Sequence, residues 1–135
     1  MQGRKLLHGG DYNPEQWLDR PDILAQDIEL MKKARVNTVT LGVFSWSVLE
    51  PEEGVFNLDW LADIIHNLYA NGIRTILATP SAARPTWLAH KYPEVCRVRA
   101  DRVRELYNRR QNYCYTSSIS VSYTHLRAHE TTLHL

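Results

Sequence analysis

The sequence of 135 residues has little of several features, and each shortage excludes a class of protein. Two cysteines are too few for a disulfide framework. No run of about 18 apolar residues occurs, so no membrane-spanning helix is predicted, and the basic start lacks the apolar core of a signal peptide. A formal net charge of +1 gives no electrostatic reason to expect nucleic acid or an anionic membrane as a partner. A cytoplasmic protein is therefore expected.

What is present is typical of a soluble globular domain, with 44% hydrophobic and 23% charged residues. Apolar runs rich in β-branched residues are centred near residues 7, 40 and 77, and such runs favour buried strands. Between them, apolar residues recur every three or four positions over residues 22–35 and 58–70. That period predicts two helices, the first opened by Pro21, the second capped by Asn57 and ended by Gly72.

The predicted order is strand, helix, strand, helix, strand, which favours a parallel sheet with right-handed crossovers. Its spacing of roughly 35 residues per unit fits a (β/α)8 barrel. A doubly wound sheet fits the order too, but the first strand-helix turn lacks the G-x-G-x-x-G pattern of the nucleotide-binding form. The expected fold class is therefore α/β, comprising the first three βα units of an incomplete TIM barrel with both helices on one side of the sheet.

Four motifs follow one another along the chain: "HGGDYNPEQW", "FSWSVLEPEEGVF", "LATPSAARPTWL" and "RRQNYC". Together they resemble the opening of glycoside hydrolase family 42, the bacterial β-galactosidases. The resemblance assigns residues 1–117 to the amino-terminal part of a catalytic TIM barrel on a chain several times longer. It also implies retaining hydrolysis of terminal β-D-galactose, a β-galactoside substrate and a homotrimer.

The last segment, residues 118–135, departs from the family pattern. Its "VSYTHLRAHET" resembles a translated adapter from DNA sequencing libraries, so an artefactual or disordered tail that packs poorly is expected. His125 and His129 have a spacing that can hold a metal on a helix, but no H-E-x-x-H glutamate or third ligand accompanies them. The metal interpretation is therefore disfavoured.

Three carboxylates in the second motif raise the question of a catalytic pair. Retaining glycosidases use two carboxyl groups about 5 to 5.5 Å apart. Glu52 and Glu53 are consecutive in a polar turn and are predicted to be surface charges, while Glu50 is predicted to brace the loop by accepting backbone N–H groups. In the family that the sequence resembles, the pair comes from the fourth and seventh strands. No catalytic residue is therefore assigned, and the chain alone is expected to be inactive.

Candidate sugar contacts follow the first two predicted strands or lie in the fourth motif. Asp11 is a possible partner for a sugar hydroxyl, with a structural role as the alternative, and Trp46 offers an aromatic face, with core packing as an equal alternative. An arginine before the cysteine contacts the sugar in the family, which implies Arg110 first and Arg109 second. The alternative for this pair is a solvated basic turn.

Cys114 matches a cysteine that binds zinc in some members of the family, together with three cysteines from a later cluster. The chain itself is therefore expected to require no cofactor, with structural zinc confined to the full-length parent. Cys96 is predicted to be a small buried apolar residue. Two alternative functions stay open: a glycosidase of this fold acting on a β-glucoside or an α-L-arabinopyranoside, and a non-catalytic carbohydrate-binding module.

Overall fold

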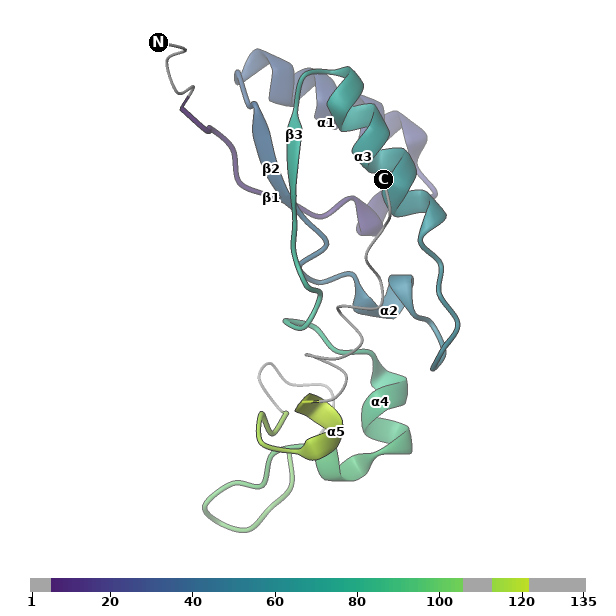
Figure 1. The fold of residues 1–135 in the computed structure, drawn as a ribbon, viewed down its shortest axis with the longest axis vertical. Coiled ribbons are helices and arrows are strands. Elements are labelled where there is room, and N and C mark those ends of the chain that lie inside the picture. Colours follow the sequence, from purple (N-terminus) through teal and green to yellow (C-terminus); the bar gives the residue numbers. More distant parts are fainter. Residues whose placement is uncertain (1–5, 106–112, 122–135) are drawn as a thin grey trace.

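The computed structural model describes residues 6–105 and 113–121. Three parallel strands, β1 (Asp11–Tyr12), β2 (Thr38–Leu41) and β3 (Arg74–Leu77), lie side by side in the order β1-β2-β3 (Figure 1). In register, Thr40 is paired with Asp11 on one side and Ile76 on the other. The parallel pairing of β2 and β3 confirms the predicted sheet.

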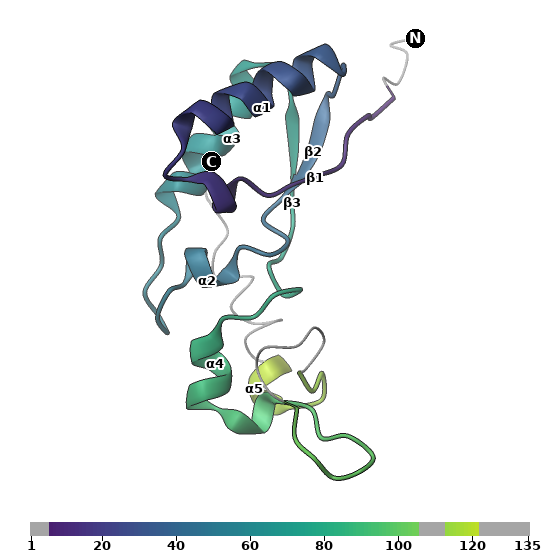
Figure 2. The same ribbon diagram turned by 180° about the vertical axis from the view of Figure 1, so that it is seen from behind.

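Two helices, α1 (Pro21–Lys33) and α3 (Asp59–Ala70), cover the same face of this sheet, as both views show (Figures 1 and 2). Pro21 occupies the first turn of α1, and charges of the favourable sign stand near both ends of that helix. The apolar stripes of the two helices meet alternate residues of β2 in one core. Its buried members are Ile28, Val39, Leu41, Leu61, Ile64, Leu68 and Ile73. The prediction of both helices on one side is confirmed.

The opposite face of the sheet is covered by no helix among the described residues. Tyr12 packs towards the helices, so Asp11 lies on the other face with Thr40 and Ile76, its neighbours in register. In a (β/α)8 barrel the helices lie outside and this second face lines the interior. The three units therefore have the layer order of a barrel segment.

The first strand differs from its predicted position. It was expected near residue 7, but β1 begins at Asp11, and Leu6 and Leu7 are exposed. The chain already follows β2 before that point, since the carbonyl of His8 accepts hydrogen bonds from the backbone N–H groups of Asn37 and Thr38. The apolar run stays exposed because β1 is an edge strand in the described sheet.

Gly9 allows this close approach of the two chain segments. A Cβ atom built at Gly9 would lie 1.6 Å from the carbonyl oxygen of Thr38. No side chain can occupy that space without moving the backbone of β2. The glycine therefore sets how closely the first segment packs against the sheet.

The ends of α3 agree with the prediction at one end only. Gly72 adopts φ +78°, and the N–H of the next residue, Ile73, donates to Leu68 O at 2.9 Å, as in a helix that ends at a glycine. At the other end Leu58, not Asn57, holds the N-cap position, without a side-chain hydrogen bond. Asn57 belongs to the preceding loop because its N–H donates to Leu49 O at 2.8 Å.

A second, smaller layer lies beyond the carboxyl ends of the strands (Figures 1 and 2). It contains the helices α2 (Trp46–Leu49), α4 (Thr86–Lys91) and α5 (Ser118–Val121), and the 3-10 turn η2 (Pro93–Val95). A further 3-10 turn, η1 (Pro14–Trp17), follows β1. The core of this layer is formed by Trp46, Leu88, Ala89, Val95 and Cys96.

The start of the final segment packs better than predicted. Ile119 lies against the second core, and Ser120 is buried. The expectation of poor packing is therefore wrong for these two residues. The apolar side chain of Ile119 is removed from water by packing against the core residues of α4 and η2. Residues 122–135 lie outside the described part of the chain. Within that part, no helix is long and apolar enough to cross a bilayer.

Candidate functional site

The chain segments that follow β2 and β3 meet at Glu50, which is 3% exposed. Its Oε2 accepts the indole N–H of Trp46 at 2.8 Å, and its Oε1 accepts the backbone N–H of Gly54 at 2.8 Å. Its backbone carbonyl accepts the indole N–H of Trp87 at 2.9 Å. The prediction that Glu50 braces its loop is confirmed, since both carboxylate oxygens are used in that way.

Glu53 ties the same loop to the helix that follows β3. Its Oε1 accepts the hydroxyl of Tyr92 at 3.1 Å, and its carboxylate forms an ion pair with Lys91 at the end of α4. The prediction that Glu53 is a surface charge is therefore wrong, because the fold brings two donors of α4 and its cap to this turn. Glu52 is exposed as predicted. The roles that the structure gives Glu50 and Glu53 are structural.

Trp46 was a candidate sugar contact with core packing as the alternative. Its side chain is 6% exposed and lies among Leu88, Ala89 and Val95. A ring buried in this way offers no open face to a ligand, and its N–H is already used by Glu50. The structure supports the packing alternative.

The remaining predicted sugar contacts fall in different places. Asp11 is exposed on β1, on the sheet face turned away from the helices and beside Thr40. This is the position that a side chain must have to reach the mouth of a barrel. Arg109 and Arg110 lie outside the described residues, so their role stays a prediction.

Sequence reasoning missed a cluster around Arg84, in the loop between β3 and α4. The Arg84 Cζ lies 4.7 Å from the centroid of the Tyr113 ring and 5.4 Å from that of the Tyr115 ring. Burial lowers the pKa of the Arg84 guanidinium, and the two tyrosines and Cys114 partly offset this. The available signal was the pair of tyrosines on either side of Cys114.

The two cysteines have contrasting surroundings. Cys114 is partly exposed, and its hydrogen bond with Thr116 (Sγ to Oγ1, 3.1 Å) lowers the pKa of the thiol. Cys96 is buried, as predicted, and burial raises the pKa of its thiol. The described residues contain no cluster of three or more histidine, cysteine, aspartate or glutamate side chains. A four-ligand zinc site therefore does not fit these residues by themselves.

Comparison with known proteins now decides the family. A model of the glycoside hydrolase family 42 β-galactosidases matches residues 11–131. The chain belongs to glycoside hydrolase family 42. Its three βα units are accordingly the first part of a family 42 TIM barrel, as the motifs and their order predicted.

Several family 42 relatives are similar along most of this chain. β-Galactosidase GalA of Bacillus licheniformis is 63% identical over 114 residues, and β-galactosidase Pbg of Clostridium perfringens is 57% identical over 115 residues. These matches cover 84% and 85% of this chain but 17% of each relative. The chain thus spans about a sixth of the length of the curated relatives it matches.

Solved family 42 structures share the fold. A catalytic mutant of Gan42B, a β-galactosidase from G. stearothermophilus, is 59% identical with a TM-score of 0.86, over 91% of this chain and 18% of that one. The β-galactosidase of Bacillus circulans sp. alkalophilus is 36% identical with a TM-score of 0.85, over 93% and 18%. The likeness therefore concerns one part of a longer enzyme, and the division predicted at residue 117 stays a prediction.

Proposed function

We propose that this chain is the amino-terminal part of a β-galactosidase that hydrolyses terminal, non-reducing β-D-galactose residues with retention of configuration. The observation that carries the proposal is the 63% identity to a relative named as a β-galactosidase, over 84% of this chain. The barrel-segment architecture supports it, since the loops after β2 and β3 lie at the end of the sheet where barrel enzymes place their sites.

In this proposal the chain contributes part of the site and not the chemistry. The acid/base and the nucleophile come from later strands, because Glu50 is already held by Trp46 and Gly54. Arg110, or Arg109 in its place, donates to sugar hydroxyls, and Asp11 accepts from one at the barrel mouth. An arginine fork and a carboxylate supply the directional bonds that distinguish one sugar from another.

The assembly and location of the parent are part of the same proposal. We infer a homotrimer in the cytoplasm, and a structural zinc ion only if later residues supply the three ligands that Cys114 lacks. A metal site of that kind needs four donors, and one thiolate cannot hold the ion.

The test is a substrate panel applied to the full-length gene product. Nitrophenyl β-D-galactoside should be hydrolysed with a kcat/KM at least about tenfold above that for the β-D-glucoside and the α-L-arabinopyranoside, a difference of about 1.4 kcal/mol. Preference for either rival glycoside would replace the galactose assignment. Binding of galactosides without turnover of any of them would support the carbohydrate-binding alternative.

A further inference from the structure

Arg84 joins two aromatic rings that come from a distant part of the chain. Its guanidinium carbon lies 4.7 Å from the Tyr113 ring centroid and 5.4 Å from that of Tyr115. The segment that carries the rings is fixed by its backbone, since Cys114 N donates to Val95 O at 2.7 Å and Tyr113 pairs with Cys96 in an antiparallel bridge. Both rings therefore face the same cation from a held backbone.

The two rings have different surroundings. Tyr113 is half-buried and packs against the second core with Trp46 and Leu88. Tyr115 is 71% exposed although Arg84 lies over its ring. A cation over an aromatic face is attracted by the ring quadrupole even at an exposed site. Tyr115 is thus an exposed ring whose orientation is already restricted, and this lowers the entropy cost of binding a ligand to it.

The position of this ring also points to a ligand. Arg84 lies in the loop that follows β3, so the cluster lies at the carboxyl end of the sheet (Figure 1). Barrel enzymes bind their substrates at that end. An oriented aromatic face next to polar groups is a common lining of sites for ligands with an apolar side, such as the C–H face of a pyranose.

We propose that the Tyr115 ring, held by the Arg84 guanidinium, is an aromatic wall on which a pyranose ring of the substrate stacks. Arg84 is then a positioning residue, which acts on the sugar through the tyrosine. This inference rests on the proposed function, because it takes its ligand class from the galactosidase assignment. It replaces Trp46 with Tyr115 as the aromatic contact that this chain provides.

The test uses the full-length enzyme and separates stacking from packing. Tyr115→Leu should raise the KM for lactose about tenfold while kcat stays within about twofold, since a contact made equally in ground and transition states changes KM alone. Tyr115→Phe keeps the aromatic face, so its KM should rise far less. Arg84→Lys keeps the charge but loses the planar group, and its KM should lie between those of wild type and Tyr115→Leu.

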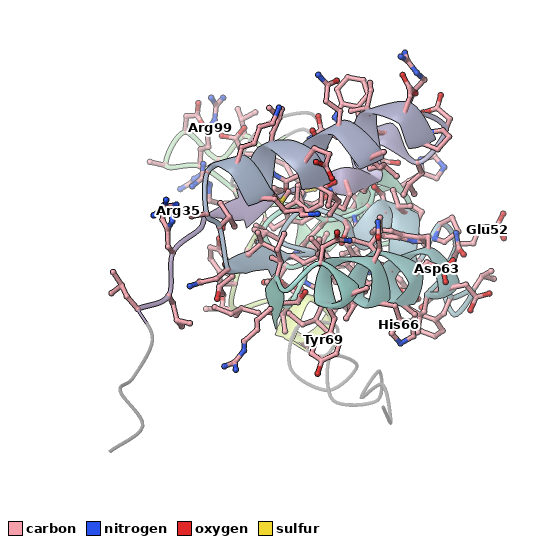
Figure 3. All side chains as sticks on the ribbon, turned by 90° about the horizontal axis from the view of Figure 1, so that it is seen from above. Arg35, Glu52, Asp63, His66, Tyr69 and Arg99 are labelled. Carbon is pink, nitrogen blue, oxygen red and sulfur yellow. The ribbon has the colours of Figure 1, made fainter. Side chains whose placement is uncertain are left out.

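The chain offers a matched control in Tyr69, which is 77% exposed near the end of α3 (Figure 3). That helix end leads into the amino end of β3, which begins at Arg74. Tyr69→Leu should leave KM and the melting temperature unchanged. An unchanged KM in Tyr115→Leu would overturn the inference. If the melting temperature of Tyr115→Leu also fell while its KM stayed unchanged, the ring would pack against the rest of the enzyme and not against the sugar. A wild-type enzyme that hydrolyses no galactoside would instead refute the proposed function, and with it the ligand assigned to Tyr115.

Discussion

Trp46 donates its indole N–H to the carboxylate of Glu50 at 2.8 Å, so a buried donor and a buried acceptor are paired in the segment that follows β2. Sequence inspection left Trp46 as a site candidate, with core packing as an equal alternative, and favoured the bracing role for Glu50. The bond supports the packing role of Trp46 and the bracing role of Glu50 together. A buried carboxylate with two donors braces a loop, and a buried ring with its N–H paired is a core residue.

Glu50→Ala should destabilise the full-length enzyme by about 2–4 kcal/mol, because the buried indole N–H of Trp46 and the part-buried N–H of Gly54 lose their acceptor. Thermal melting measures the change. Glu50→Gln is the matched control and should cost less, since one acceptor oxygen remains. Its kcat should stay within a few-fold of wild type. A fall of about a thousandfold with an unchanged melting temperature would instead give Glu50 a role in the chemistry.

Gly9→Ala should lower the free energy of unfolding by about 1–3 kcal/mol, because its new methyl group meets the Thr38 carbonyl. Gly10→Ala provides the control, since a Cβ there has no described heavy atom within 4 Å. Chemical unfolding of both variants measures the difference. Equal stability of the two would show that the first segment does not pack against β2 as described.

Arg110→Ala should reduce the kcat/KM of the full-length enzyme by a factor equivalent to about 2–4 kcal/mol, if its bond to the sugar tightens in the transition state. The melting temperature should not change. Arg109→Ala should have a much smaller effect. The reverse order of the two variants would mean that Arg109, one position closer to Tyr107, contacts the sugar in place of Arg110.

Alkylation of the two cysteines should differ in rate and in pH dependence. Hydrogen bonding to Thr116 lowers the pKa of the Cys114 thiol, whereas burial raises the pKa of Cys96. After treatment with a chelator, Cys114 should react first near neutral pH, because more of it is thiolate there. Its rate should level off at a lower pH than that of free cysteine. Equal labelling of both residues, read by mass spectrometry, would contradict this assignment.

The sequence predicted the parallel order and the two core helices because their signals are local. The spacing of apolar residues that places Ile28 and Leu68 on the buried faces of their helices can be read within a few positions of each. The glycine that ends α3 is a local signal of the same kind. The predicted position of the first strand was wrong. Burial of Leu6 and Leu7 depends on which part of the protein covers the β1 edge of the sheet, and the local sequence does not contain that information.

The site was harder to predict for a related reason. Arg84 and Tyr115 are neighbours in space only because the segment at Cys114, which is hydrogen-bonded to Val95 of η2, lies beside the loop after β3, a long-range contact without periodicity. The hydrogen bond between Glu53 and Tyr92 is likewise a long-range contact, and it connects the polar turn after α2 to the end of α4. Glu50, by contrast, was predicted correctly, because its donors Trp46 and Gly54 stand four residues to either side.

In the proposed function, this chain contributes the frame of a β-galactosidase site and later strands contribute its two carboxylates. The direct measurement is hydrolysis of nitrophenyl β-D-galactoside by the 135-residue chain and by the full-length enzyme, with the anomer of the first-formed galactose read by NMR. The full-length enzyme should release β-galactose, the retained anomer, and the short chain should release none. Turnover by the short chain, or α-galactose as the first product of the full-length enzyme, would contradict the claim.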